Sequence, residues 1–171
     1  MARDSMFWLI DFLRVKMNDM ESSIWADDEF QNYLDIHSIH VVREPLTYAP
    51  DQKLYYSTFG MLEADACLWD SDQPGAIEIL NSIYTSNFVD GTFRFTKSQS
   101  GRYYMDAKSY NIHGAIAECL EQLAMDQNRA KVWNRGSVEF THYDLLEMSR
   151  YHRGLAGLQN TNISRTYIKR G

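Results

Sequence analysis

The chain has 171 residues and a net charge of −6, from 17 basic and 23 acidic residues. Apolar residues make up 44% and charged residues 23%, which excludes a wholly disordered chain. No run of about 18 apolar residues occurs, so we expect no transmembrane helix. The charge is uneven, because five basic and no acidic residues follow from Arg150 onward and the preceding 149 residues carry −11. The composition therefore predicts an acidic body with a basic tail.

Helical spacing of apolar residues predicts a first helix over 4–18, and Asp11 and Arg14 make it an amphipathic helix rather than a signal peptide. We expect a second helix over about 27–43, with Asp27 as its N-cap and Leu34 on its apolar face. Pro45 bars its continuation. Trp25 precedes the cap and should pack back on the first turn.

Residues 46–102 are rich in aromatic and branched side chains, interrupted by turn residues, which predicts an antiparallel sheet of three to five strands. The Asp90-Gly91 pair indicates a tight hairpin. In the following strand, Phe93 and Phe95 share one face because side chains alternate along a strand. This segment therefore reads as a β-rich insertion.

Helical spacing returns at about Met105, with Asp106 or Ser109 as the cap, and continues to about 128–131. Thr141 should cap the last helix, with Asp144 at the capping-box position. From Leu158 onward the sequence has no periodicity, so we expect an extended tail.

The five histidines are the first candidates for chemistry. His37 and His40 lie three residues apart on the predicted second helix, a spacing that could share a metal ion, but a buried structural histidine is the commoner reading. His113, His142 and His152 are scattered, and no nucleophile turn or phosphate-binding glycine loop occurs. We therefore predict no enzymatic activity, no metal site and no cofactor.

Two further features have simple interpretations. Cys67 and Cys119 have no CxxC spacing and lie among apolar residues, which predicts two buried free thiols. The aromatic insertion carries Arg94, Lys97 and Arg102, a combination seen in nucleic-acid stacking surfaces. The charge of −11 on the body argues against binding to phosphates.

Three stretches carry a combined pattern. In IDFLRVKMNDMESSIWADDEFQNYLDIH, a helix is followed by a Trp, an acidic cap and a Tyr-Leu pair. In VDGTFRFTKSQSGRYYMDAKSYNIHGAIAECLEQLA, a Gly-x-Phe-x-Phe hairpin edge leads to a Tyr110-Asn111 step and an Ala-rich helix. In KVWNRGSVEFTHYDLLEMSRYHR, a polar turn with glycine precedes a helix that closes on Tyr-x-Arg. Together these stretches resemble the head–tail connector proteins of tailed bacteriophages, also called adaptor or head-completion proteins, in which the step is more often Tyr-Asp.

The resemblance implies an α+β fold with a four-helix connector core, an antiparallel β-rich insertion between helices 2 and 3, and an extended C-terminal tail. It implies one connector domain over 1–159, with the insertion at about 46–102, and a basic docking tail over 160–171. The residues that define the fold under this resemblance are Trp25, Asp27, Leu34, Phe93, Phe95, Tyr110 and Thr141.

The resemblance also implies a structural role at the head–tail junction of the virion, after assembly in the host cytoplasm. About twelve copies would form a ring that binds the portal protein above and a neck or tail protein below. DNA would pass through the lumen without specific binding, because an acidic lining repels phosphates. The tail residues expected to dock on the portal are Ile163, Arg165, Tyr167, Ile168, Lys169 and Arg170.

Two alternatives belong to other functional classes. The acidic surface also fits a small binding protein that inhibits a basic host factor. A metal-dependent hydrolase built on His37 and His40 is the third hypothesis.

Overall fold

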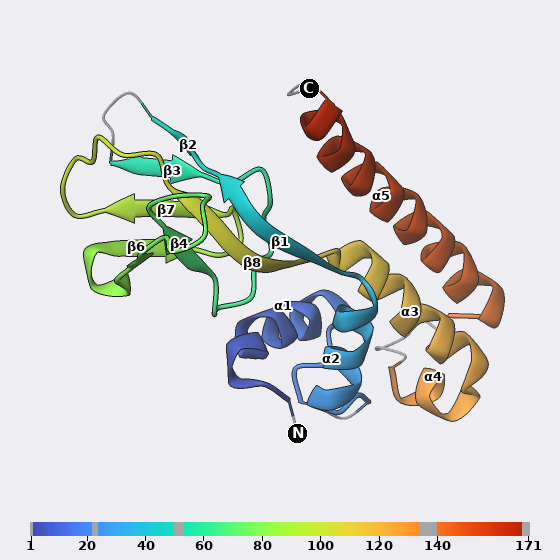
Figure 1. Ribbon diagram of the computed structural model, residues 1–171. Helices are drawn as coiled ribbons and strands as arrows, with labels where there is room; N and C mark the ends of the chain where they lie inside the picture. The colour runs from blue at the N-terminus through green and yellow to red at the C-terminus, as the bar shows by residue number, and fades with distance from the viewer. Residues whose placement is uncertain (1, 22–23, 50–52, 134–139, 169–171) are drawn as a thin grey trace. The chain divides into compact units, whose positions relative to one another are not determined.

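The computed structural model describes residues 2–21, 24–49, 53–133 and 140–168, and for residue 132 and residues 159–168 it describes the backbone alone. Two compact units divide the chain (Figure 1). The first, which we call the helical unit, combines 1–37 with 111–171, and the second, the β unit, is 38–110. The predicted insertion, 46–102, falls inside the β unit.

The helical unit is built from helices contributed by both ends of the chain. Its elements are the 3-10 turn η1 (Asp4–Met6) and the helices α1 (Phe7–Met17), α2 (Asp27–Ile36), α3 (Ile112–Met125), α4 (Gln127–Trp133) and α5 (His142–Ile168). The helix α3 is central, because α1, α2, α4 and α5 all pack against it. Its packed face carries small or absent side chains at the buried residues Gly114, Ala115 and Ala117, so neighbouring helices can approach closely.

The helix α2 has its N-cap one residue before the predicted position. The N-cap is Ala26, not Asp27, and Asp27 is the first helical residue. Glu29 accepts a hydrogen bond from the Ala26 amide at 2.9 Å, as in one half of a capping box. Trp25 is fully buried and packs on Phe30, with ring centroids 5.4 Å apart, so the predicted hydrophobic staple is present.

The predicted end of the second helix, near Arg43, is wrong. The helix α2 stops at Ile36, and Ser38–Pro45 form the strand β1. Ile39, Val41 and Val42 favour an extended backbone, and β1 pairs with β8 (Tyr104–Tyr110) on both sides of an irregularity between Val41 and Glu44. Pro45 therefore ends a strand and not a helix.

The described part of the β unit forms two antiparallel four-stranded sheets. One has the strand order β1-β8-β4-β5, where β4 is Cys67–Trp69 and β5 is Glu78–Ile79. The other has the order β2-β3-β7-β6, from Thr47–Tyr48, Leu54–Tyr56, Thr92–Phe95 and Tyr84–Asn87; the short 3-10 turn η2 (Asn81–Ile83) precedes β6. Tyr84 lies opposite Phe95 across the Asp90-Gly91 turn, so the predicted hairpin is present.

An aromatic cluster forms the core of the second sheet. Phe93 and Phe95 are buried on one face while Arg94 is exposed, as the alternation predicts. Phe95 stacks on Tyr103 at a centroid distance of 4.9 Å, and Tyr55 meets both rings edge-on at 5.1–5.2 Å. Offset and edge-on contacts of this kind stabilise a sheet beyond simple burial.

The predicted helix start at about Met105 is also wrong. Residues 104–110 form β8, and the helix α3 begins only at Ile112. Its cap is Asn111, whose side chain accepts a hydrogen bond from the Gly114 amide at 3.1 Å. The Asn111 amide in turn donates to the His37 carbonyl at 3.0 Å. This hydrogen bond joins the residue at which the chain leaves the helical unit to the residue at which it returns.

Over residues 158–168 the predicted extended tail is a helix, and residues 169–171 lie outside the described part of the chain. The helix α5 spans 27 residues, about 40 Å at 1.5 Å per residue. Residues 158–168 contain neither glycine nor proline, so the chain contains no strong breaker there. Thr141 caps this helix as expected, because its hydroxyl accepts from the Asp144 amide at 3.2 Å and its own amide donates to the Asp144 carboxylate at 2.8 Å.

The fold is therefore α+β, but the four-helix core is wrong. Among the described residues, five α-helices form the helical unit, and a pair of four-stranded sheets replaces the small insertion. In the part of the chain that the structure describes, no helix has the length and apolar character needed to span a bilayer.

Candidate functional site

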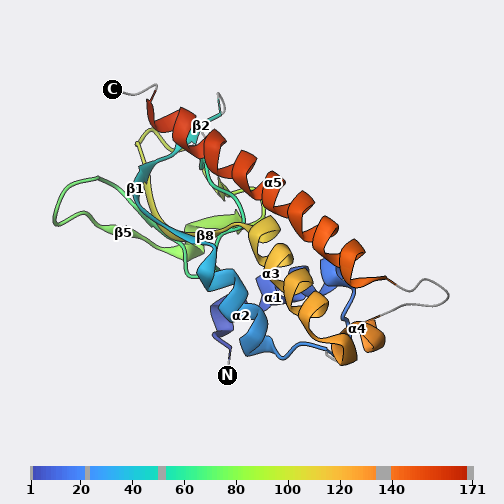
Figure 2. The same cartoon turned by 90° about the vertical axis from the view of Figure 1, so that its right-hand side faces the viewer.

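The outer surfaces of α5 and α1 are the candidate site, and α3 holds both helices in place. The helices α3 and α5 lie side by side in both ribbon views (Figures 1 and 2). Asn111 Nδ2 donates to the Ala156 carbonyl at 3.0 Å, and Ser149 Oγ donates to Glu121 Oε1 at 2.8 Å. Leu145 and Ser149 are buried in this contact. The first half of α5 is therefore fixed by packing along its inner face.

A charged cluster reinforces the α3–α5 contact. Arg153 donates from Nε and Nη2 to the two carboxylate oxygens of Glu121, at 2.8 and 2.6 Å, and from Nη2 to Glu118 at 3.1 Å. The hydrogen bond from Arg153 lowers the pKa of Glu121 below its ordinary value. Glu118 also meets His37 Nε2 at 3.2 Å, so α3 carries an acidic row between the end of α2 and α5.

Two histidines meet beside this cluster. His113 Nδ1 and His152 Nδ1 are 3.0 Å apart, which makes one ring the donor and the other the acceptor. Burial lowers the pKa of both rings, with the charge of Lys16 adding to the effect on His113. The pair therefore favours the neutral state, in which α3 and α5 share a hydrogen bond.

The outer face of α5 is aromatic and exposed. Tyr143, Tyr151 and Leu158 are 61–65% exposed, and Arg150 is exposed beside them. Positions 143, 147, 151, 154 and 158 follow one face of a helix. Gly154 lies on this face, and a Cβ added there would meet open space. Large apolar side chains in a row on an outer helix face are typical of a protein-binding surface.

The first helix has a second such face. Phe7 and Val15 are 48% and 57% exposed, with Asp4 and Asp11 exposed on the same face. The inner face of α1 is held by a buried arginine. Arg14 Nη1 donates to Asp19 Oδ2 at 3.0 Å, and Arg14 Nη2 donates to Asp27 Oδ1 at 2.6 Å.

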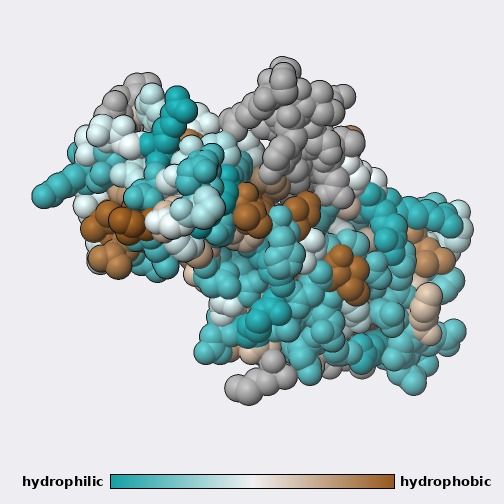
Figure 3. Space-filling view, in the orientation of Figure 1, coloured by the Kyte–Doolittle hydropathy of each residue, from teal (hydrophilic) through white to brown (hydrophobic). Residues whose placement is uncertain are grey.

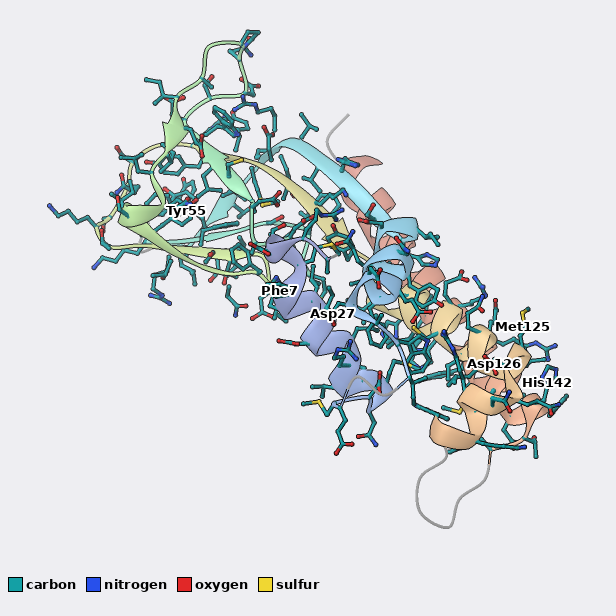
Figure 4. All side chains as sticks on the ribbon, turned by 90° about the horizontal axis from the view of Figure 1, so that it is seen from below. Phe7, Asp27, Tyr55, Met125, Asp126 and His142 are labelled. Carbon is teal, nitrogen blue, oxygen red and sulfur yellow. The ribbon has the colours of Figure 1, made fainter. Side chains whose placement is uncertain are left out.

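Figure 4 shows how these two faces are placed in the helical unit. Phe7 lies on α1 at one end of the unit, while Met125 and His142 lie at the other end, where α3 finishes and α5 begins (Figure 4). His142 Nδ1 lies 2.7 Å from the Ala124 carbonyl, which fixes the start of α5 against the end of α3. The exposed faces of α1 and α5 are therefore different surfaces of the helical unit.

The predicted portal-docking residues lie at the end of α5 and beyond it. The backbone of Ile163, Arg165, Tyr167 and Ile168 is helical, and their side chains lie outside the described part of the chain. Lys169 and Arg170 lie wholly outside it. Four of these residues therefore lie at the end of a helix and not on an extended arm, while their docking on the portal stays a prediction.

The residues predicted to define the fold are mostly in the core. Trp25, Leu34, Phe93, Phe95 and Tyr110 are buried. The Tyr110 hydroxyl donates to the buried carboxylate of Glu63. Thr141 is an exposed cap, and Asp27 is an exposed partner of Arg14.

The predicted histidine pair on one helix does not form. His37 follows the last residue of α2 as its C-cap, whereas His40 lies exposed on β1, so the helical spacing that would bring them together is lost. Among the residues that the structure describes, no group of three or more metal-ligating side chains comes together. Cys119 is buried and Cys67 half-buried, and both are free thiols.

A small cavity of about 210 Å³ lies near the start of α5. Its polar lining is contributed by Gln127, Lys131 and His142. The His142 ring nitrogen Nδ1 already contacts the Ala124 carbonyl, so this atom is used in packing. The cavity is therefore best explained as a gap between packed helices.

Sequence reasoning missed the three polar contacts that organise the helical unit. Arg14 reads as an interruption of an apolar patch, yet it is 5% exposed and ion-paired. The His113–His152 pair and the Arg153 cluster join residues more than 30 positions apart, so their spacing carries no local signal. Only the placement of Arg153 and Glu121 on facing helices could have indicated the cluster.

Comparison of the chain with protein families, curated proteins and solved structures finds no match.

Proposed function

We propose that the chain is a structural protein of the head–tail junction of a tailed bacteriophage, in which copies form a ring below the portal. The ring joins the DNA-filled head to the tail and leaves a channel for DNA. The proposal rests on the resemblance of three stretches of the sequence. The first and third of these stretches lie in the helical unit, and the second enters it at Asn111.

One observation carries the proposal further than the resemblance. Tyr151 and Leu158 are exposed on the outer face of the helix α5, while its inner face packs against α3. From Arg150 to the last residue the chain has five basic and no acidic residues. A helix that is anchored at one end and basic at the other supports binding to an acidic protein surface.

The test is binding to the portal protein of the same phage. Charge reversal of Arg165, Lys169 and Arg170 to glutamate should abolish co-sedimentation with portal rings, while circular dichroism stays unchanged. The matched control reverses three exposed cations of the β unit, Arg94, Lys97 and Arg102, which changes the net charge equally. Equal binding by both variants would contradict the docking assignment.

The alternative of an inhibitor of a basic host factor makes a different prediction. An inhibitor would bind its target through the acidic body, so the tail variant would retain capture and no portal binding would be seen. Portal binding that depends on the tail cations supports the connector proposal against this alternative.

A further inference from the structure

We infer that Asn111 couples the end of α5 to the crossing, by which we mean His37 and Asn111, the residues at which the chain leaves the helical unit and returns to it. The inference rests on the proposed docking of the α5 end and adds a response of the fold to that docking. When a partner holds the end of α5 in its helical form, the crossing should open less often. The contacts that support this coupling all lie within the helical unit.

The side chain of Asn111 contacts two different helices. Its Oδ1 accepts a hydrogen bond from the Gly114 amide at 3.1 Å and so caps α3, while its Nδ2 donates to the Ala156 carbonyl of α5 at 3.0 Å. Its backbone amide donates to the His37 carbonyl at 3.0 Å, which closes the crossing. Asn111 is 4% exposed, so losing one of these partners would leave a buried polar group unsatisfied. One buried residue therefore holds α3, α5 and the crossing together.

The His37 side of the crossing is fixed by α3. A Cβ at Gly114 would lie 2.5 Å from His37 Nδ1, so the ring lies directly against the helix. His37 Nε2 lies 3.2 Å from Glu118 Oε1, and the same oxygen accepts a hydrogen bond from Arg153 of α5 at 3.1 Å. This second route to α5 is the weaker one, because the Arg153 side chain is 44% exposed and exposed ion pairs contribute little. The crossing is therefore linked to α5 chiefly through Asn111.

The helix α5 has its weakest helix formers where Asn111 contacts it. Gly154 and Gly157 lie on either side of Ala156, and glycine lowers helix stability more than any residue except proline. A Cβ at either glycine would meet open space, so packing requires neither of them. The backbone continues as helix to Ile168, through residues that are expected to dock. Local opening of the α5 end should therefore begin near Ala156 and break its hydrogen bond to Asn111.

An apolar patch on the β unit does not identify a partner. Ile77, Leu80 and Ile83 are exposed beside the edge strand β5, and Figure 3 shows an apolar patch over β6 and the segment before it. Nothing in the described part of the chain shows what would cover this patch. The contacts of Asn111 therefore carry the inference.

The test separates the two roles of the Asn111 side chain. Asn111→Asp and Asn111→Ser both keep an oxygen that can cap α3, and both lose the amide group that donates to Ala156. Two variants are used because the new carboxylate of Asn111→Asp would be buried. Each is combined with Gly154→Ala and Gly157→Ala, which stabilise the helix around Ala156. Hydrogen exchange of the backbone amide of residue 111, measured by NMR, reports opening of the crossing.

The glycine replacements give the decisive comparison. With Asn111 in place, they should slow exchange of this amide about fivefold, the effect of one hydrogen bond of ordinary strength. In either Asn111 variant the same replacements should leave the exchange rate unchanged. The matched control is Ser149→Ala, which removes a different hydrogen bond between α3 and α5 and should preserve the fivefold effect. Equal slowing with and without the Asn111 side chain, or no slowing with Asn111 in place, would overturn the coupling.

Portal rings test the same coupling from the side of the partner. Portal binding should slow exchange in the peptide that contains residue 111 of the unmodified chain, measured by mass spectrometry. It should not do so in Asn111→Ser, which keeps the docking cations, and equal slowing in both chains would overturn the coupling. Unmodified chain that does not bind the portal would contradict the proposed function, while the glycine comparison would still decide the coupling. The two failures are therefore distinguishable.

Discussion

Single side chains in the helical unit carry more of its stability than their sequence context suggests. Arg14 is enclosed by Asp19, Asp27 and the Trp25 carbonyl, and its guanidinium lies 4.9 Å from the centre of the Phe30 ring. Asp19 is 2% exposed and also accepts from the Trp25 amide. This one arginine therefore connects α1, the following loop and the start of α2.

Replacement of Arg14 by methionine should leave the Asp19 carboxylate buried without its cation. Removal of one partner of a buried ion pair costs about 3–5 kcal/mol, so we expect a loss of stability of that order. Lys16→Met is the matched control, because Lys16 is exposed on the same helix, and should change stability by less than about 0.5 kcal/mol. Urea denaturation followed by circular dichroism measures both, and similar midpoints would contradict the buried-pair account.

Two glycines of the helical unit should respond in opposite ways to alanine. A Cβ at Gly114 would lie 2.5 Å from His37 Nδ1, which would displace the ring that meets Glu118. We expect Gly114→Ala to cost about 1–3 kcal/mol, as overpacking does. A Cβ at Gly154 meets open space on a helix, so Gly154→Ala should stabilise by up to about 1 kcal/mol. Thermal melts of the two variants that shift in the same direction would contradict this assignment.

At the scale of elements, the pair α3–α5 should respond to pH through His113 and His152. Both folded-state pKa values are lowered from the ordinary value of about 6.5, so the unfolded state binds more protons as pH falls. Stability is therefore retained above pH 6.5 and falls as pH drops below it. The charge of Lys16 on α1 adds to the lowering of the pKa of His113, and His113 adds to that of His152.

The measurement is the denaturant midpoint from pH 7.5 to 5, for the unmodified chain and for His113→Gln with His152→Gln. We expect the slope below pH 6.5 to flatten in the double variant. His142→Gln serves as the control, because His142 lies outside the pair. A slope that survives in the double variant would place the pH response elsewhere.

Local features of the helices and strands could be predicted where they depend only on neighbouring residues. The Trp25 staple, the Thr141 cap and the Asp90-Gly91 hairpin each depend on a few adjacent residues, and the structure contains all three. The sequence did not predict that α2 ends at Ile36 or that residues 104–110 form the strand β8. The reason is that β1 and β8 stabilise each other across about 70 residues of chain. Helical spacing cannot reveal such a partner, and β-branched residues at 39–42 were the only local hint.

At the scale of the whole molecule, the same limits apply to the candidate site. The basic character of the chain after Arg150 was visible in the sequence, and its helical form was not. The exposed faces of α1 and α5 could not be identified from the sequence, because this requires knowing that α3 packs against the opposite face of each helix. Apolar residues at helical spacing are otherwise read as core, which is the commoner outcome.

The central claim is a ring docked on the portal. Electron microscopy of the full chain mixed with portal rings from the same phage tests it most directly. The account predicts a second ring of density below the portal, which is absent when Arg165, Lys169 and Arg170 are replaced by glutamate. Portal particles that stay bare in the presence of excess unmodified chain would contradict it.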